Sequence, residues 1–597
     1  MSGGFPAKWI SEGRKHARVA LRNEQVLLSG LAVVIGVAAA FAAVLFRELI
    51  GLIQTGFYGF GHELVASGVS GLAWWQVLLA PVIGGLLIGL FVRYLMPGGR
   101  PQGVADVIEA NALRAGRVSG RVGLGAAFVS AASIGAGASV GREGPAVHLG
   151  ATMASWIGRR FRLNRSQSRT LLGCGVAAAV AASFNAPVAG VFFALEVVIG
   201  HYALTAFAPI VIASVAGTVV SRTYFGDVPA FIVPPHEIAS FFEFGAFALL
   251  GITSAVAAVT FMRVFRYSQQ LADFTRLPLW LRPAVGGLVV GGIAIYYPEI
   301  LGVGYEGMDN ALNENYALSM LIILALLKIV ATGISFGFGF GGGLFSPSLF
   351  IGAMVGGAFG IVASIPNPDL SSGHGAYTLV GMGAVSGAVL GAPISTMLII
   401  VELTGDYRLT IAVMVSVVIA SLLTRTLHGP SIFHDQLSAR GINLRGSHDV
   451  AVLSGVTVND LMREDVSTVR SDASLDDVRQ ALLGAPGGVV FVIDGRNQLK
   501  GSVTLSGLGK RAFARGAEGD FKLDDVIDRS RPILAVDEDL GSVLDQFGSC
   551  RDGQLPVVRK RGWPVLVGQL DETEVMRAYN QALERLRDEE HGESGGR

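Results

Sequence analysis

One acidic residue stands out in an apolar, glycine-rich part of the chain. Glu143 lies in the segment Gly141-Arg142-Glu143-Gly144-Pro145, just before a Gly-Pro pair that favours the start of a helix. The first turn of a helix exposes unpaired N–H groups and a partial positive charge, which attract anions. We therefore interpret Glu143 as a gate, a carboxylate that takes an anion's place when ionised and leaves it when protonated. A structural ion pair between Glu143 and Arg142 is the alternative, and the sequence favours neither.

The segment around Glu143 recurs later in the chain. At an offset of 202 residues, 133–145 aligns with 335–347, with one serine, three glycines and the final proline in common. Downstream, residues 186–196 match 392–402: each block begins with Ala-Pro and ends in a glutamate nine residues after the proline. Matched segments broken by Gly and Pro are typical of transporters built from two repeats, with the binding site at the repeat interface. Helix starts from both halves would hold an anion there, and no cluster with metal-ligand spacing indicates a cation.

The elements around these motifs belong to a membrane protein. Of 597 residues, 51% are hydrophobic and only 15% are charged, with zero net charge. Apolar stretches interrupted by Gly and Pro are expected where helices surround a cavity at membrane depth. Zero net charge removes the electrostatic basis for binding nucleic acid. The sequence also shows no nucleophile triad of the kind that would indicate an enzyme. Residues 438–597 hold 47 of the 92 charged side chains, so a soluble part follows the membrane part.

Taken together, the motifs resemble those of the CLC family of chloride channels and chloride/proton antiporters. Residues 141–145 are similar to the family's gating-glutamate motif, residues 184–190 with Glu196 to the helix after the gate, and residues 343–347 to its second pore motif. The resemblance covers about residues 25–440. It implies an all-α membrane fold of two inverted repeats with many short or broken helices. It also implies a homodimer with one pore per subunit, in a bacterial inner membrane, with both termini cytoplasmic.

The resemblance also assigns residues to the pore. Chloride or another small anion would be held by backbone N–H groups of Leu344 and Phe345, with Glu143 as the gate. The further anion-binding positions that it implies are Gln102, Gly103, Arg142, Gly144 and Phe433.

Two of these positions depart from the family's pattern. Gln102 stands where the family has the serine of its first pore motif, and Phe433 stands where it has a tyrosine. A glutamine amide donates hydrogen bonds but is longer and also carries an acceptor, and phenylalanine donates none. The choice among chloride, nitrate and bicarbonate therefore stays open.

A third departure concerns protons. Antiporters of the family commonly carry a proton-transfer glutamate directly after the position of Glu196, and here that residue is Val197. Valine there is typical of the family's channels, so we expect a channel or weakly coupled transporter. A proton-coupled exchanger that uses another route, and a membrane sensor with a vestigial pore, are the alternatives.

The soluble part resembles a tandem pair of cystathionine-β-synthase (CBS) modules with an α/β fold. Such pairs often bind adenine nucleotides, which here would involve Thr504, Asp571 and Glu574. The family's ribose-binding aspartate is replaced by Gly507 and Glu574, so a ligand-free scaffold is the alternative. The pore itself is expected to require no cofactor.

The predicted organisation has six parts, and the modules are expected to regulate the pore through the linker. The parts are an N-terminal cytoplasmic segment (1–24), the membrane pore (25–437), a linker (438–453), the first module (454–515), the second module (516–582) and a charged tail (583–597), with a short helix expected at 584–590.

Overall fold

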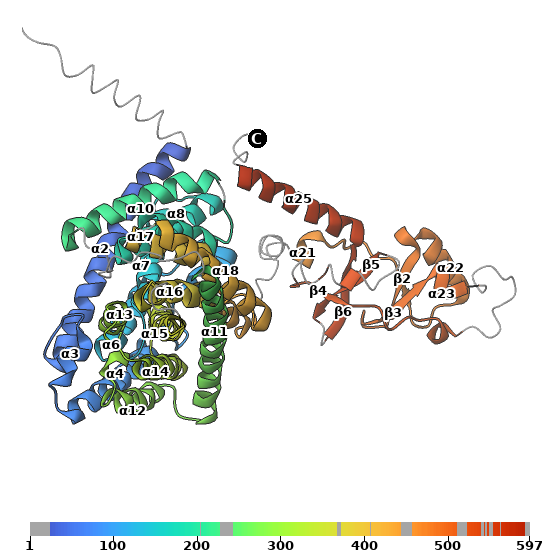
Figure 1. Cartoon of the computed structure of the whole chain (residues 1–597). Coiled ribbons are helices and arrows are strands. Elements are labelled where there is room, and N and C mark those ends of the chain that lie inside the picture. Colours follow the sequence, from blue (N-terminus) through green and yellow to red (C-terminus); the bar gives the residue numbers. More distant parts are fainter. Residues whose placement is uncertain are drawn as a thin grey trace, which may run out of the picture. The chain divides into compact units, whose positions relative to one another are not determined.

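The computed structural model describes residues 24–202, 204–226, 243–366, 372–405, 407–442, 457–509, 522–538, 543, 546–547, 553–560 and 563–591. The chain forms two compact units, residues 1–443 and 444–597. The first is helical and the second contains all the described strands (Figure 1). The division falls within the predicted linker, most of which lies outside the described residues together with the N-terminal segment 1–23.

The first half of the helical unit contains helices α2 to α10. Their bounds are α2 Glu24–Tyr58, α3 Val65–Ser70, α4 Trp74–Leu95, α5 Val104–Leu113, α6 Gly120–Gly135, α7 Glu143–Arg160, α8 Arg165–Phe184, α9 Pro187–Phe193 with a π-helical turn at Ala194–Ile199, and α10 Leu204–Phe225. Several are too short to cross a bilayer alone, as the Gly and Pro interruptions predict.

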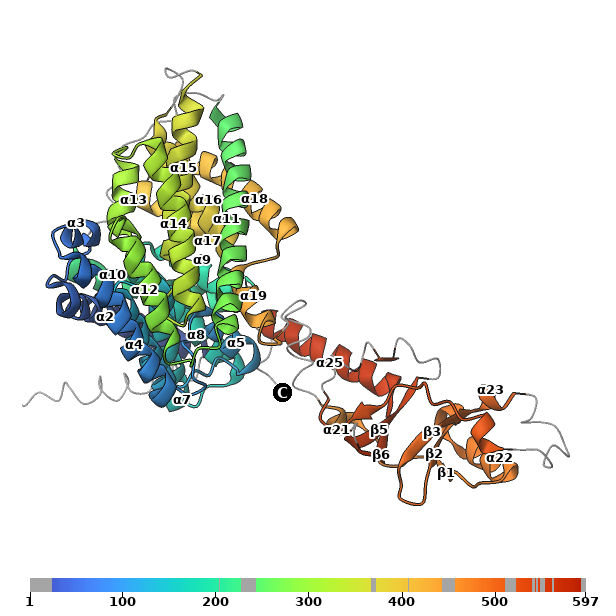
Figure 2. The ribbon, with the colours of Figure 1, turned by 90° about the horizontal axis from the view of Figure 1, so that it is seen from below.

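The second half contains helices α11 to α19. Their bounds are α11 Glu243–Phe274, α12 Arg282–Ala294, a 3-10 turn at Pro298–Ile300, α13 Tyr305–Leu312, α14 Leu318–Gly337, α15 Phe345–Ser364, α16 His374–Leu390, α17 Pro393–Thr404, α18 Tyr407–Leu427 and α19 Ile432–Ser438. Figure 2 shows α11, α14 and α15 running alongside one another, and the three helices are in contact.

The two halves repeat the same local structure, as the sequence predicts. Helices α6 and α14 end at Gly135 and Gly337, and helices α7 and α15 begin at Glu143 and Phe345, with the same 202-residue offset. In both α7 and α15 a proline is the third residue, within the first turn, where its missing N–H costs no helical hydrogen bond. Each gap between the helices is a glycine-rich turn.

The centre of the helical unit consists of two closely packed helix pairs, α7 with α8 and α15 with α16. Gly150 and Gly175 meet in the first pair, and Gly352 and Gly381 meet in the second. In each pair, a Cβ on either glycine would collide with the carbonyl oxygen of the other. Close approach of backbones therefore explains part of the glycine content, because small residues allow helices to pack tightly in lipid.

Seven described helical segments are long and apolar enough to cross a membrane. Many apolar side chains on them are exposed, as expected for contact with lipid, whereas most of α8 and α16 is buried. The predicted all-α membrane fold with short and broken helices is thus confirmed.

The soluble unit contains two three-stranded sheets of the same topology. In the first, β1 Thr468–Arg470 is parallel to β2 Val489–Ile493, which is antiparallel to β3 Leu499–Thr504. In the second, β4 Leu534–Ala535 is parallel to β5 Gln554–Lys560, which is antiparallel to β6 Trp563–Asp571. The described helices of this unit are α21 Val458–Leu461, α22 Leu475–Gly484, α23 Leu505–Leu508 and α25 Glu572–His591.

The cores of the two modules cross the predicted boundary at residue 515. Val458, from the predicted first module, is buried in the core around β5 and β6, and its N–H donates to the carbonyl of Glu538. Leu523, from the predicted second module, is buried in the core around β2 and β3. A boundary at residue 515 therefore separates the two sheets along the chain, but it does not separate the two hydrophobic cores.

One terminal helix is longer than predicted. The short helix expected at 584–590 is the end of α25, which begins at Glu572 directly after β6. No Gly or Pro interrupts residues 572–591, so the helix continues without a break.

Candidate functional site

The two glycine-rich turns meet each other at the interface of the repeats. The N–H of Gly141 donates to the carbonyl of Gly343, and the N–H of Gly343 donates to the carbonyl of Gly141, each at 2.7 Å. These two glycines are equivalent positions of the repeat, so the pairing is symmetric. A Cβ on Gly343 would lie 2.6 Å from the backbone nitrogen of Gly144, so a side chain at this position would push the turns apart.

Glu143 is the first residue of α7 and lies beside this pairing, with 2% of its surface exposed. The hydroxyl of Tyr305 donates to Oε1 at 2.8 Å, and the hydroxyl of Ser346, in the first turn of α15, donates to Oε2. The carboxylate therefore lies against the start of the helix from the opposite repeat, as expected of a group that takes an anion's place.

Arg142 has a closer carboxylate partner than Glu143. Its Nη1 pairs with Oε1 of Glu63, whereas its Nε lies 3.9 Å from Glu143. Arg47 pairs with the same oxygen of Glu63 at 2.8 Å, and the guanidinium of Arg142 lies 4.6 Å from the centre of the Tyr305 ring. Arg142 therefore does not form a dedicated ion pair with Glu143, and the gating role of Glu143 stays a prediction.

Glu63 lies in the loop between α2 and α3. Desolvation raises the pKa of its carboxyl, but the charges of Arg142 and Arg47 outweigh that effect and hold the pKa below its usual value. Glu63 stays ionised near neutral pH and compensates one of the two arginine charges next to Glu143.

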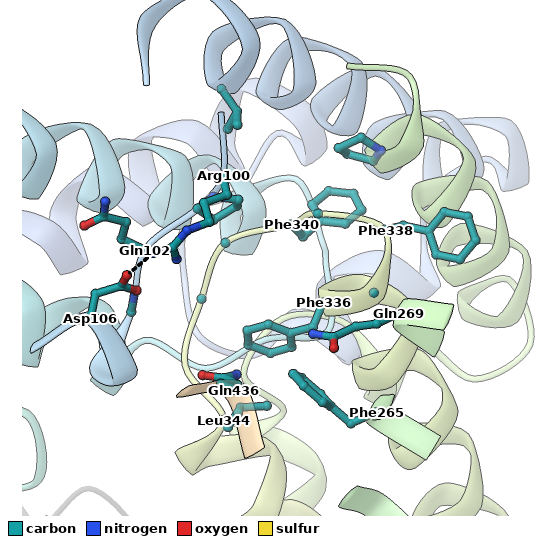
Figure 3. A pocket seen from close by; sticks show the side chains of 18 of the residues that line it. Arg100, Gln102, Asp106, Phe265, Gln269, Phe336, Phe338, Phe340, Leu344 and Gln436 are labelled. Atoms are coloured by element: carbon teal, nitrogen blue, oxygen red, sulfur yellow. Dashed lines mark hydrogen bonds and ion pairs between the residues drawn. The ribbon is translucent and has the colours of Figure 1, made fainter. Parts of the chain in front are cut away.

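Two cavities lie near Glu143, and residues adjacent to it in space line each of them. The Arg142 cavity, about 430 Å³, is lined by Arg47, Glu63, Arg142 and Tyr305 among others. The Gln102 cavity, about 350 Å³, is shown in Figure 3, and its wall includes Gly343 and Leu344. Glu143 itself lines neither cavity, but its partner Tyr305 lines the first, and Gly343, which touches the adjacent Gly144, lines the second.

Four of the predicted anion-binding residues line the Gln102 cavity together. Gln102, Gly103 and Phe433 meet Leu344 there, although they come from the start of α5, from α19 and from the start of α15. Within the described chain, the N–H groups of Leu344 and Phe345 donate to no protein acceptor, which leaves them available to an anion. The side chain of Phe345 does not line the cavity, since it packs against Phe184 and Phe193.

Glu196 lies away from these cavities and joins the two halves of the chain. It accepts hydrogen bonds from the N–H groups of Ile394 and Ser395, at 3.1 and 2.8 Å, at the start of α17. Its repeat partner Glu402 accepts from the N–H groups of Val188 and Ala189, at 2.9 and 2.8 Å, at the start of α9. Each glutamate thus caps the helix of the other repeat. The predicted proton-path role of Glu196 and Val197 remains a prediction.

We predict that this reciprocal capping stabilises the helical unit. Glu196→Ala and Glu402→Ala should each lower the free energy of unfolding by about 1–2 kcal/mol, since each leaves helix N–H groups without acceptors. Thermal unfolding of the purified chain in detergent measures this, with Glu48→Ala as control because Glu48 is an exposed glutamate on α2. Midpoints equal to that of the control would contradict a stabilising role.

Residues predicted for a nucleotide site have local partners. The hydroxyl of Thr504 accepts from the N–H of Gly507 at 3.0 Å and caps α23. Asp571 lies 3.8 Å from Arg463, and Glu574 pairs with Arg577 at 2.9 Å. Thr504 ends β3, whereas the two acids lie at the junction of β6 and α25, so a shared site would have to bridge the modules.

Sequence reasoning missed four residues around Glu143. Glu63, Tyr305 and Ser346 contact Arg142 or Glu143, and Arg47 pairs with Glu63. Ser346 could have been identified from the sequence, because it lies inside the second pore motif. The other three come from separate elements, and no spacing in the sequence relates them to Glu143.

The fold and this site define a membrane transport protein built from two repeats whose glycine-rich turns meet at the repeat interface. A family model described as "Voltage gated chloride channel" matches residues 84–425, and one described as "CBS domain" matches residues 458–509. The chain belongs to the CLC family of chloride channels and antiporters and carries a C-terminal CBS domain.

Named relatives are similar over the membrane part. A "Putative chloride channel protein ClcB-like" of Ralstonia nicotianae is 32% identical over 407 residues, which is 68% of this chain and 95% of the relative. A "Voltage-gated ClC-type chloride channel ClcB" of Escherichia coli is 30% identical over 68% of this chain and 97% of its own length.

Solved structures share the fold at lower identity. A slow cyanobacterial Cl−/H+ antiporter has a TM-score of 0.61 at 22% identity, covering 69% of this chain and 97% of the antiporter. A eukaryotic CLC transporter has a TM-score of 0.59 at 20% identity, and the likeness covers 92% of this chain and 97% of the transporter.

Proposed function

We propose that this chain conducts chloride or another small anion between the Gln102 and Arg142 cavities, and that Glu143 gates the passage. The observation that carries the proposal is the position of the Glu143 carboxylate. It is held by the hydroxyl of Tyr305, which lines the Arg142 cavity, and by the hydroxyl of Ser346 at the start of α15. Leu344, two residues before Ser346, lines the Gln102 cavity, and arginine side chains line both cavities. An ionised carboxylate there blocks an anion by occupying its place. A protonated one loses its charge, binds those hydroxyls more weakly and can leave.

The transport is proposed to be channel-like or only weakly coupled to protons. Val197 lies on the π-helical turn Ala194–Ile199 and has no group that can carry a proton. The carboxylate of the neighbouring Glu196 already accepts hydrogen bonds from N–H groups at the start of α17. These two facts support a chain without an inner carboxylate for proton transfer.

A coupled exchanger is the second candidate. Two of the solved structures that share the fold are described as Cl−/H+ and fluoride/proton antiporters. Their identity to this chain is 22%, so they support the shared architecture, and the mechanism has to be measured.

The full-length chain reconstituted in liposomes separates these candidates. With a chloride gradient imposed and both chloride and pH recorded, we expect chloride to move down its gradient without uphill proton movement. Proton movement against its own gradient, in fixed ratio to chloride, would identify an exchanger. Absence of anion flux would support the sensor with a vestigial pore.

Regulation is proposed to come from the soluble unit. The CBS match at 458–509, and a second sheet of the same topology at 534–571, support a pair of CBS modules. An adenine nucleotide near Thr504, Asp571 and Glu574 is the proposed ligand of the pair. Calorimetric titration of the full-length chain with AMP, ADP and ATP tests it, and no heat for any of the three would exclude the nucleotide.

The chain is further proposed to work as a homodimer in a bacterial inner membrane, with cytoplasmic termini and one pore per subunit. The exposed apolar side chains of α10 and α18, among them Val215, Val219, Val418 and Leu422, suit either a second subunit or lipid. Cross-linking in native membranes that yields monomers alone would contradict the dimer.

A further inference from the structure

A basic surface lies where the loop between α5 and α6 meets the loop between α7 and α8. Residues 114–121 and 159–169 contain eight arginines and no acidic residue. The carbonyl of Val118 accepts from Nη1 of Arg159 at 2.7 Å, and a Cβ on Gly116 would lie 2.9 Å from a carbonyl oxygen in the first turn of α8. The two arginine-rich segments therefore form one surface.

Some of these arginines hold the two loops in place. Arg165 donates to a carbonyl at the end of α5 at 3.4 Å, and Arg169 donates to an asparagine side chain of α5 at 3.3 Å. Arg114 pairs with Glu109, whose other oxygen lies 3.7 Å from Nη1 of Arg440. Because two arginines share the one carboxylate, it leaves most of the positive charge of the surface uncompensated.

Four arginines of this surface remain exposed, with no side-chain hydrogen bond or ion pair within the described chain. They are Arg117, Arg121, Arg160 and Arg162, and we call them the basic patch. A guanidinium group binds phosphate oxygens through two parallel N–H donors. A cluster of unpaired arginines therefore suits a ligand that carries phosphate.

The backbone of Arg162 has a conformation that favours glycine. Its φ is 54°, in the left-handed region, and it directly follows Phe161, the C-cap of α7. Helices commonly end with a glycine in this conformation, because other residues place a Cβ close to the backbone there. Replacing Arg162 by glycine would therefore remove a charge from the basic patch without straining the turn.

The basic patch lies beside the end of a membrane-spanning helix. Gly125, one turn after Arg121 on α6, packs so closely against Met96 that a Cβ would lie 2.5 Å from its sulfur, and Met96 directly follows the spanning helix α4. Trp156 and Phe161, close in the chain to Arg160, expose 59% and 55% of their surface. Aromatic side chains such as tryptophan gather at the level of the lipid headgroups, where phosphate and hydrocarbon are both within reach.

From this arrangement we propose that the basic patch binds the headgroup of an anionic phospholipid, with the acyl chains beside Trp156 and Phe161. A soluble phosphate compound would use the guanidinium groups but would gain nothing from the two exposed rings. A lipid uses both, because its headgroup and its acyl chains belong to one molecule. The lipid site does not depend on anion conduction, so the failure of either one leaves the other standing.

Quenching of tryptophan fluorescence by brominated lipids tests the site. Full-length protein is reconstituted in phosphatidylcholine vesicles that contain brominated phosphatidylglycerol or, at the same mole fraction, brominated phosphatidylcholine. The chain has six tryptophans, and the part of the quenching that Trp156→Phe removes reports lipid beside the basic patch. For wild type we expect this part to show binding of phosphatidylglycerol about ten-fold tighter than binding of phosphatidylcholine.

Neutral variants test the arginines themselves. Arg160→Gln and Arg162→Gly should each lower the preference for phosphatidylglycerol about five-fold, the usual effect of one arginine near an anionic surface. Arg162→Gly is expected to fold, since its backbone favours glycine. Arg425→Gln is the matched control, because Arg425 is an exposed arginine in the last turn of α18 and lies outside the basic patch. Equal quenching by the two lipids in wild type, or variants that match Arg425→Gln, would overturn the site.

Soluble anions separate a lipid site from a general phosphate site. An excess of glycerol 3-phosphate or inorganic phosphate, at matched ionic strength, should leave the preference for phosphatidylglycerol unchanged, because neither reaches the hydrocarbon beside Trp156. Competition by either compound would indicate a site for soluble phosphate compounds and would overturn the lipid site. Added salt should weaken the preference, since exposed charges are screened, and a preference that salt leaves unchanged would contradict binding through the arginines.

Discussion

Replacing Glu143 by alanine is expected to raise anion flux at neutral pH about ten-fold or more and to remove its dependence on pH. The carboxylate blocks the site while it is ionised and held by Tyr305 and Ser346. Wild-type flux should therefore increase as pH falls and the blocking charge is lost. Alanine has neither the charge nor the reach to occupy the site, so flux should be high at every pH. Anion efflux from liposomes between pH 4.5 and 7.5 measures both effects.

The partners of Glu143 provide graded versions of the same experiment. Tyr305→Phe and Ser346→Ala each remove one donor to the carboxylate, so flux at neutral pH should lie between wild type and Glu143→Ala. Glu299→Gln is the control, because it removes a carboxylate outside the contacts of Glu143. A pH dependence that survives in Glu143→Ala would mean that another group is the gate.

Much of this arrangement could be predicted from the sequence because the same motif occurs once in each half of the membrane part. The repeat of Ser, Gly and Pro at a fixed offset made Gly141 and Gly343 equivalent positions near the expected repeat interface, and the structure joins these two residues by a pair of hydrogen bonds. The motif resemblance brought Gln102, Leu344 and Phe433 to one site, and all three line one cavity. Repeats and motifs allow these predictions because each turn has a backbone conformation that its own residues determine. The symmetry of the two repeats then brings the distant turns into contact.

The parts that sequence could not supply depend on side chains from unrelated elements. Tyr305 follows Gly304, whose φ of 88° turns the chain into α13, and nothing local shows that its hydroxyl faces a carboxylate 162 positions away. No motif or spacing in the sequence marks Glu63 either. The sequence motif assigned Glu196 to a proton path, which stays a prediction, and it did not reveal that Glu196 caps α17. The spacing from Ala-Pro to glutamate is identical in both halves, and it corresponds to the two glutamates that each cap a helix of the other repeat.

Replacing Gly343 by alanine is expected to reduce anion flux at least ten-fold and to destabilise the helical unit by roughly 1–3 kcal/mol, the usual cost of overpacking. The new Cβ would lie 2.6 Å from the backbone nitrogen of Gly144 and 3.3 Å from the carbonyl oxygen of Gly141. Both neighbours are backbone atoms and cannot rotate away. The turns must separate, and the paired 2.7 Å hydrogen bonds between Gly141 and Gly343 would lengthen.

This separation acts on function because the same turns aim the starts of α7 and α15. Gly343 directly precedes Leu344 and Phe345, whose free N–H groups are the proposed anion ligands, and Gly141 lies two residues before Glu143. A shift of either turn therefore misaligns the gate and its site together. Gly292→Ala is the matched control, since its Cβ would meet no atom within 4 Å on α12. Liposome flux and thermal unfolding of Gly343→Ala that match Gly292→Ala would show that the contact between the repeats tolerates a side chain, and that the gate does not depend on it.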